Sequence, residues 1–174
     1  MTHILIVGNS DTPRAGFLEL LLVQLKPRPK LYGYRSVKEA PDETGRAPIY
    51  IYPAEGPKVQ GKDNLLGWCK EKSAESYPEI FEKYACLIES ARPDGLLILD
   101  EIGPMESRSP RFCAAVLKAL DGDIPVLASV RDKDTPFLRA VREHKKVQCF
   151  DLNRESGGKL FPIAMDLLLK QLGR

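Results

Sequence analysis

The sequence contains no long hydrophobic run and no block of like charge. No apolar stretch approaches the roughly 20 residues that a membrane-spanning helix requires. The 26 lysine and arginine residues nearly balance the 24 acids, and the basic cluster at residues 26–30 contains prolines typical of a stiff connector. We therefore expect neither a membrane span nor a dedicated nucleic-acid surface. Because an apolar strand pattern, and not a signal peptide, opens the chain, we expect a cytoplasmic location.

Histidine and cysteine are too few and too scattered to indicate a catalytic or metal centre. The two histidines, His3 and His144, are far apart in sequence, and the four cysteines lack C-x-x-C spacing. Cys86 and Cys113 fall within apolar helical patterns, where a reduced thiol packs as a small hydrophobic side chain. We expect no disulfide, no zinc site and no histidine-based dyad.

Length and hydrophobic periodicity predict one α/β domain spanning residues 1–174. Strands are predicted at residues 3–7, 31–37, 48–53, 96–99, 125–130 and 146–152. Helices are predicted before residue 25 and at residues 77–90, 109–120, 135–143 and 159–172. The short link between the second and third strands predicts a β-hairpin, and a loop follows it. The expected fold is a three-layer α/β/α sandwich around a mainly parallel sheet, with this β-hairpin as an insertion.

Two adjacent acids at the end of the most apolar strand are the strongest functional signal. Residues 96–99 are followed by Asp100 and Glu101, and then by the breakers Gly103 and Pro104. Open α/β sheets bind ligands at the carboxyl ends of their strands. Neighbouring strand residues face opposite sides. Asp100 could therefore hold Mg²⁺ through water while Glu101 orients an attacking water, as in a Walker B strand. The alternative is that both acids only cap the following turn.

Residues 8–15 lie between the first strand and a helix, where a phosphate-binding loop would be found. The pattern of such a loop is G-x-x-x-x-G-K-[ST]. Gly8 matches its first position, whereas Pro13, Arg14 and Ala15 replace the second glycine, the lysine and the hydroxyl. The candidate nucleotide-binding residues of this loop are Gly8, Asn9, Ser10, Asp11, Thr12, Pro13, Arg14 and Ala15.

Each replacement is expected to weaken phosphate binding in its own way. Pro13 removes a backbone donor but suits the first helical position, with Thr12 or Asp11 as the N-cap. Arg14 keeps the positive charge, although its fork is bulkier than a lysine, and Ala15 cannot ligate Mg²⁺. Asp11 competes with phosphate for the helix amides. Since each lost charged hydrogen bond costs about 1.5–3 kcal/mol, turnover could vanish while the fold survives. A capped helix start without phosphate is the alternative.

Further polar residues follow other strands. Asn153 and Arg154, after the last strand, are candidates for contact with a nucleotide base or ribose, the alternative being a turn capped by Asn153. Arg131 could reach a γ-phosphate, or lie in a solvated turn. Arg46 on the hairpin is a weaker phosphate candidate. Trp68 could stack on a base, but a lone tryptophan among apolar neighbours is more often a core residue.

Residues 94–106, Asp-Gly-Leu-Leu-Ile-Leu-Asp-Glu-Ile-Gly-Pro-Met-Glu, resemble the Walker B signature of a known family. This family comprises the small P-loop nucleoside-triphosphatases that include the cancer-related nucleoside-triphosphatase. Similar segments are residues 112–130, Tyr32-Gly-Tyr followed by Gly45-Arg46, and Asn153-Arg154. The resemblance covers nearly the whole chain.

The resemblance implies a P-loop fold and a site for a nucleoside triphosphate with Mg²⁺. By position, residues 8–15 would hold the phosphates, Asp100 would support Mg²⁺ and Glu101 would serve the attacking water. The chain departs from the family in the altered loop and at Ser36-Val37, where the family tends to have a hydroxyl followed by an acid.

Three functions agree with the sequence, of which we favour the first, with the second as a close alternative. The first is slow, Mg²⁺-dependent hydrolysis of a nucleoside triphosphate, with Glu101 and Arg14 as catalytic residues. The second is a catalytically impaired relative that keeps the fold and some nucleotide affinity and has a regulatory or scaffold role. The third is a phosphotransferase acting on a small metabolite, which rests on fold analogy alone. No motif specifies a protein partner or self-association.

Overall fold

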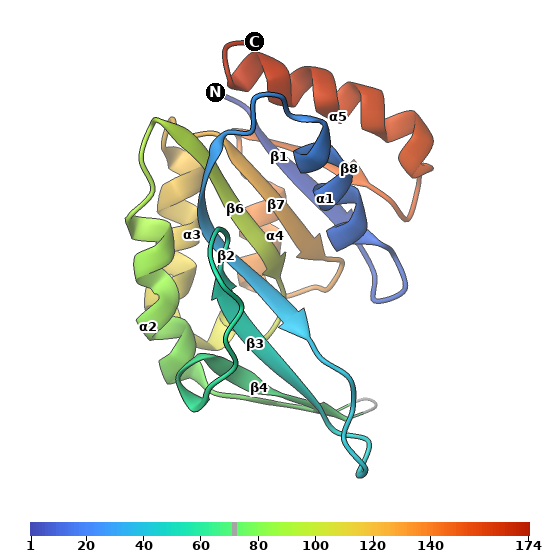
Figure 1. Ribbon diagram of the computed structural model, residues 1–174. Helices are drawn as coiled ribbons and strands as arrows, with labels where there is room; N and C mark the ends of the chain where they lie inside the picture. The colour runs from blue at the N-terminus through green and yellow to red at the C-terminus, as the bar shows by residue number, and fades with distance from the viewer. Residues whose placement is uncertain (71–72) are drawn as a thin grey trace.

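The computed structural model describes residues 1–70 and 73–174 (Figure 1). In these residues, eight strands form one sheet in the order β5-β4-β3-β2-β6-β7-β1-β8. The strands are β1 (His3–Gly8), β2 (Lys30–Lys38), β3 (Ala47–Pro53), β4 (Leu65–Lys70), β5 (Ser73–Ser76), β6 (Gly95–Ile102), β7 (Val126–Arg131) and β8 (Val147–Asp151). The helices are α1 (Arg14–Gln24), α2 (Pro78–Glu89), α3 (Pro110–Asp121), α4 (Pro136–Arg142) and α5 (Gly157–Gln171), with a short 3₁₀ turn, η2 (Glu106–Arg108), after β6.

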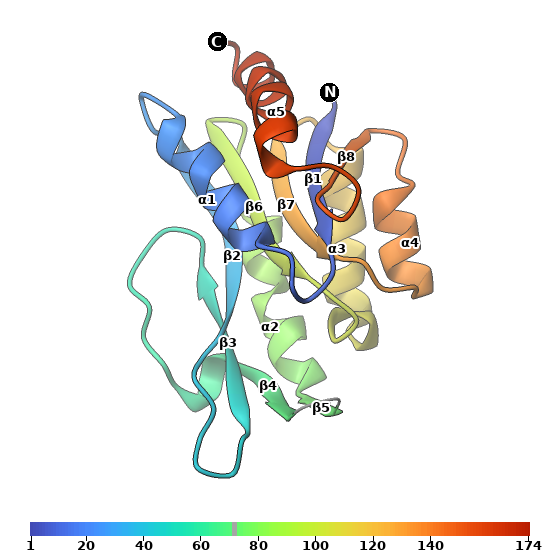
Figure 2. The ribbon, with the colours of Figure 1, turned by 90° about the vertical axis from the view of Figure 1, so that its right-hand side faces the viewer.

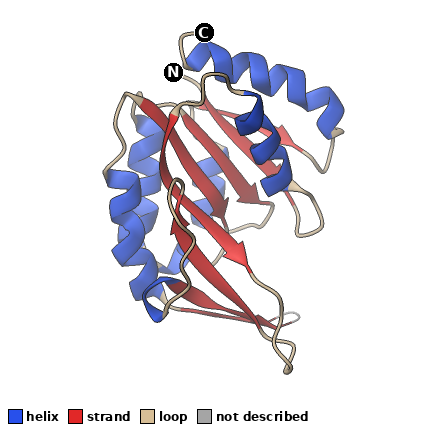
Figure 3. Cartoon of the chain, in the orientation of Figure 1, coloured by secondary structure: helices blue, strands red, loops and turns tan. Residues whose placement is uncertain are grey.

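Helices cover both faces of the sheet, which confirms the predicted three-layer sandwich (Figures 2 and 3). α1 and α5 pack on one face, and α2, α3 and α4 pack on the other. β2, β6, β7, β1 and β8 run parallel, whereas β3, β4 and β5 are antiparallel to their neighbours. No helix in the described residues is both long enough and apolar enough to cross a lipid bilayer.

The central strands are apolar on both sides because both of their faces are covered. In β6, Leu97 and Leu99 pack toward α2 and α3, while Leu96 and Ile98 pack toward α1 and α5. This alternation follows from the two-residue repeat of a strand. It explains why the segment has no polar position until Asp100. The acids therefore begin where the coverage by helices ends.

The antiparallel part of the sheet is larger than the sequence suggested. The predicted hairpin is present as β2 and β3, but β4 and β5 extend it and were not predicted. Gly67 explains part of the omission, since a glycine inside a strand weakens the strand signal. Here it is required, because φ is +153° and a Cβ atom would lie 1.9 Å from the Glu75 carbonyl oxygen. Close approach of the two backbones selects glycine at this position.

Phe112 provides a test of the packing between α3 and the sheet. Its side chain is fully buried between the rings of Tyr34 and Phe81, at centroid distances of 5.2 and 5.4 Å. We expect Phe112→Ala to lower the free energy of unfolding in urea by about 3–5 kcal/mol, because it leaves a cavity. Val59→Ala, at a site that is 70% exposed, should change this free energy by less than about 0.5 kcal/mol. Equal effects of the two substitutions would contradict the packing described.

Candidate functional site

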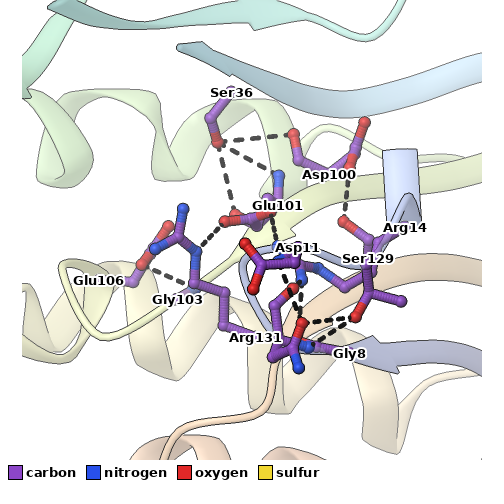
Figure 4. A network of polar contacts seen from close by, with 12 residues as sticks. Gly8, Asp11, Arg14, Ser36, Asp100, Glu101, Gly103, Glu106, Ser129 and Arg131 are labelled. Carbon is purple, nitrogen blue, oxygen red and sulfur yellow. Dashed lines mark hydrogen bonds and ion pairs between the residues drawn. The ribbon is translucent and has the colours of Figure 1, made fainter. Parts of the chain in front are cut away.

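The carboxyl ends of β1, β6 and β7 bring most of the predicted site residues together (Figure 4). β1 ends at Gly8, β6 carries Asp100 and Glu101, and β7 ends at Arg131. Because β7 lies between β1 and β6 in the sheet, the loop of residues 8–15 (the 8–15 loop) meets the acidic end of β6 across it. The expected convergence of the loop and the acids is therefore present in the fold.

Arg14 connects the 8–15 loop directly to β6. Its side chain is buried, with 4% of the residue exposed. Nη1 donates hydrogen bonds to the carbonyl oxygens of Gly8, at 2.8 Å, and of Asn9. Nη2 forms an ion pair with Oε2 of Glu101 at 2.5 Å. Arg14, in the place of the phosphate-binding lysine, is thus bonded to the protein's own backbone and to the acid of β6.

Backbone amides of the 8–15 loop are also bonded within the protein. The Asn9 N–H donates to Thr12 Oγ1 and to Asn153 Oδ1, both at 3.1 Å. The Asp11 N–H donates to Asn9 Oδ1 at 3.0 Å, and the Arg14 N–H donates to the Thr12 carbonyl at 2.8 Å. A phosphate-binding loop instead presents such amides to its ligand. A phosphate would have to displace these bonds before the loop could hold it.

The start of α1 differs from the sequence prediction. Pro13 occupies the N-cap position, with φ −79° and ψ 58°, and the helix begins at Arg14. Neither Thr12 nor Asp11 caps the helix; the Thr12 hydroxyl donates back to Asn9 Oδ1 at 2.8 Å. Such local side-chain bonds compete with capping. The prediction of Pro13 as the first helical residue, capped by Thr12 or Asp11, is wrong.

Two loop residues take no part in this network of bonds. Ser10 is exposed in the turn, and Ala15 is exposed on the first turn of α1. Ala15 presents a methyl group where a phosphate-binding loop has a hydroxyl, so α1 offers no side-chain oxygen for a metal ion at this position.

Glu101 is held by two arginines. Arg14 Nη2 contacts Oε2, and Arg131 Nε contacts Oε1, each at 2.5 Å. A quarter of the Glu101 side chain remains exposed. Arg131, for which a γ-phosphate contact and a solvated turn were the two alternatives, thus pairs with the predicted catalytic acid. Each carboxylate oxygen of Glu101 thus contacts one arginine nitrogen and keeps a further lone pair that a water molecule could use.

Asp100, the predicted metal ligand, is buried beside Ser129. Its Oδ1 accepts a hydrogen bond from the Ser129 hydroxyl at 2.5 Å. Burial raises the pKa of the Asp100 carboxyl, and the Ser129 bond opposes this shift. The Asp100–Glu101 peptide bond is cis, and the β6–β7 register shifts between Leu99 and Ile102.

The residues present fit Mg²⁺ poorly. Mg²⁺ requires near-octahedral oxygen coordination, commonly from one or two carboxylates plus substrate phosphates. Asp100 offers one carboxylate, which is buried and bonded to Ser129, and Ala15 offers no oxygen from its side chain. Within residues 1–70 and 73–174, no group of three or more histidine, cysteine or acidic side chains is placed to hold a metal ion. The predicted Mg²⁺ site at Asp100 is therefore incomplete in the protein alone.

Asn153 supports the 8–15 loop. Besides accepting from Asn9, its Oδ1 accepts from the Thr12 hydroxyl at 3.1 Å, and its Nδ2 donates to Asp132 at 3.2 Å. Arg154 is 84% exposed in its side chain and pairs with Asp151. A large apolar groove between α1 and α5 adjoins this region, but neither Asn153 nor Arg154 lines it. Their contact with a base remains a prediction.

Arg46 and Trp68 lie outside the site. Arg46 stacks on the Trp68 ring at 4.8 Å and pairs with Glu75 at 3.0 Å. All three residues belong to the antiparallel end of the sheet, away from the 8–15 loop (Figure 1). Trp68 is half-buried beneath Arg46, so it is neither a core residue nor placed to stack on a ligand at the strand ends.

Glu106 is a buried acid that had no predicted role. It lies at the start of η2, is 4% exposed, and its Oε2 accepts the Gly103 N–H at 2.9 Å. Burial raises the pKa of the Glu106 carboxyl to about 8, and the neighbouring charge of Glu101 adds to the shift. Its sequence signals were its place at the end of the family-like segment 94–106 and its position among turn residues soon after β6.

A sheet of this order, with a loop after β1 facing two acids on β6, defines an α/β protein of the P-loop nucleoside-triphosphatase class. A family model described as NTPase matches residues 70–165, which is more than half of the chain. The chain belongs to this NTPase family. The matched segment contains Asp100 and Glu101 but begins after the 8–15 loop.

Curated relatives and solved structures agree with this assignment. Nucleoside-triphosphatase THEP1 of Thermofilum pendens is 40% identical over 81 residues, covering 45% of this chain and 40% of that protein. THEP1 of Thermotoga maritima is 32% identical over 73 residues, 42% of each chain. The matched segments thus span about two fifths of these relatives. The crystal structure of Aquifex aeolicus THEP1 has a TM-score of 0.72 at 20% identity, covering 97% of this chain and 99% of that one. The solution structure of a human cancer-related nucleoside triphosphatase gives 0.68 at 17%, covering 98% of both.

The buried Glu106 predicts a specific pH dependence of stability. Its pKa is about 8 in the folded protein against 4.5 when unperturbed, so between these values the unfolded state ionises first and folding weakens. We expect the free energy of unfolding to fall by up to about 1.4 kcal/mol per pH unit across this window, relative to Glu106→Gln, and to level off above it. Denaturation of both proteins between pH 5 and about 9 measures this difference. Parallel curves would contradict it.

Proposed function

We propose that this chain is a catalytically impaired member of the NTPase family, which binds nucleoside triphosphate weakly and has lost its hydrolysis. The observation that carries the proposal is the buried guanidinium of Arg14. It is bonded to the carbonyl oxygens of Gly8 and Asn9 and to the carboxylate of Glu101. The residue that would attract phosphate and the residue that would serve water neutralise each other.

Opening this arrangement has a cost that nucleotide binding must offset. Hydrogen bonds to charged groups contribute about 1.5–3 kcal/mol each, so breaking one lowers affinity by about one to two decades. Arg14 would lose its bond to Glu101 and at least one bond to the loop. The amides of Asn9 and Asp11 would also exchange internal partners for phosphate. These losses support weak binding.

The metal side of the site supports the same proposal. Ala15 lacks the hydroxyl that binds Mg²⁺ in intact phosphate loops, and Asp100 is bonded to Ser129. Without a well-held metal ion, little would neutralise the charge that develops on a transferring phosphoryl group. The relatives named THEP1 are called nucleoside-triphosphatases, which supports a nucleoside triphosphate as the ligand class here.

A second candidate is slow, Mg²⁺-dependent hydrolysis. It is favoured by the intact acid pair on β6 and by Arg131 next to Glu101. In this case the 8–15 loop would open, Arg14 would turn to the phosphates, and the freed Glu101 would orient water. Asn153 would act only by positioning the loop.

Phosphate release separates the two candidates. We expect the purified protein, given a panel of nucleoside triphosphates with Mg²⁺, to release phosphate no faster than Glu101→Gln, because hydrolysis is absent from both. A rate in the unmodified protein that is at least about tenfold above that of Glu101→Gln would establish the second candidate and overturn the proposal.

Restoring the loop should restore nucleotide binding. The combined substitutions Pro13→Gly, Arg14→Lys and Ala15→Thr rebuild the pattern G-x-x-x-x-G-K-[ST] from Gly8. We expect nucleoside triphosphate with Mg²⁺ to bind at least about tenfold more tightly by calorimetry. The reason is that a lysine at position 14 would not bridge two carbonyl oxygens and Glu101 as Arg14 does. Glu101→Gln in the restored protein should leave this affinity largely unchanged. An affinity equal to that of the unmodified chain would show that the loop sequence does not limit binding.

A further inference from the structure

A small cavity of about 150 Å³ lies next to Glu101, between the strand ends and the antiparallel part of the sheet. Its polar lining comes from Ser36 and Lys38 on β2, Glu101 on β6, Glu106 on η2 and Arg131 on β7. No residue of the 8–15 loop lines it. The cavity therefore adjoins the site described above but is separate from the place where a phosphate tail would lie.

The polar end of the cavity carries more positive than negative charge. Arg131 uses Nε to pair with Glu101, and its two Nη nitrogens have no hydrogen-bond acceptor among the described residues. The Lys38 ammonium group also has no hydrogen-bond acceptor among residues 1–70 and 73–174. The charge of Glu101 is already balanced by Arg14 and Arg131. Glu106 is mainly uncharged at neutral pH, since burial raises its pKa to about 8. An anion would meet net positive charge here.

The other end of the cavity is apolar. Ile49 on β3 and the partly exposed Pro104 and Met105 after β6 line it, and the buried side chains of Leu66 and Phe81 also border it. Apolar cavities of about this volume stay dry and accept a molecule the size of benzene. The space thus suits a body of about six to ten non-hydrogen atoms and is too small for a nucleoside.

We propose that this cavity binds a small organic anion, with a carboxylate or phosphate head at Arg131 and Lys38 and an apolar, ring-sized body against Pro104 and Met105. The head would engage donors of Arg131 that Glu101 leaves free. The body would replace empty volume with contacts to apolar side chains. This site needs no nucleotide and does not rest on the function proposed above.

Model ligands test both halves of the site. Benzoate and phenyl phosphate carry the two possible heads on the same ring, while benzyl alcohol and inorganic phosphate each carry one half only. We expect benzoate, phenyl phosphate or both to bind the chain at least about tenfold more tightly than benzyl alcohol and inorganic phosphate do. Amide chemical shifts measure these affinities. Whichever of benzoate and phenyl phosphate binds more tightly identifies the head group as a carboxylate or a phosphate. Absence of saturable binding below about 10 mM, or inorganic phosphate binding as tightly, would overturn the proposal.

Matched variants locate the binding. Arg131→Gln should weaken binding at least about tenfold, whereas Arg92→Gln, which removes an exposed arginine elsewhere, should not. Ala74 on β5 is exposed and lines the cavity, so Ala74→Phe should block it without disturbing the core. Ser73→Phe, which faces the opposite side of the same strand, is its control. Unchanged affinity in both Arg131→Gln and Ala74→Phe, with native spectra, would overturn the assignment. Since no nucleotide is present, this outcome is independent of the hydrolysis experiments.

Discussion

The ion pair between Arg14 and Glu101 is the interaction on which the site depends. It joins the first residue of α1 to the end of β6, 87 positions away in sequence. The same guanidinium holds the carbonyl oxygens of Gly8 and Asn9. One side chain therefore contacts both the backbone of the 8–15 loop and the acid opposite it. Asn153 holds the other side of the loop through Asn9 and Thr12, so the closed conformation is supported from two strand ends.

Arginine can make this connection because of its geometry. Its planar fork offers five donors in fixed directions, whereas a lysine ammonium is a compact charge with three rotatable donors. A lysine at position 14 could not bridge two carbonyl oxygens and a carboxylate in the same manner. Arginine in place of lysine keeps the positive charge. It thus replaces a group suited to binding phosphate with one that holds the loop through hydrogen bonds. Ala15 and Pro13 agree with this change, since both remove groups that phosphate or its metal ion would use.

The sequence predicted the layers and the meeting point of the site, but not its internal bonds. The apolar run before Asp100 revealed a buried parallel strand, and parallel strands place their carboxyl ends together. β4 and β5 escaped prediction because Gly67 interrupts a short pattern whose pairing depends on a distant backbone. The partner of Arg14 could not be read locally, since it lies 87 residues away. Glu106 ends the family-like segment 94–106, but its burial depends on tertiary packing that the segment does not reveal.

The closed loop is not a perfectly satisfied structure. In the described part of the chain, the Nε of Arg14 is buried without a hydrogen-bond partner. Its Nη1 donates to the Gly8 carbonyl and its Nη2 donates to Glu101. A buried donor of this kind costs about 1–3 kcal/mol. This cost lowers the free energy needed to open the loop, because a ligand that satisfies every donor of Arg14 recovers it. A ligand shifts such an equilibrium only by the difference in its affinity for the two states. The unsatisfied Nε therefore favours ligands that present acceptors to Nε and to both Nη nitrogens at once, and a polyphosphate has more oxygen atoms for this than a single carboxylate.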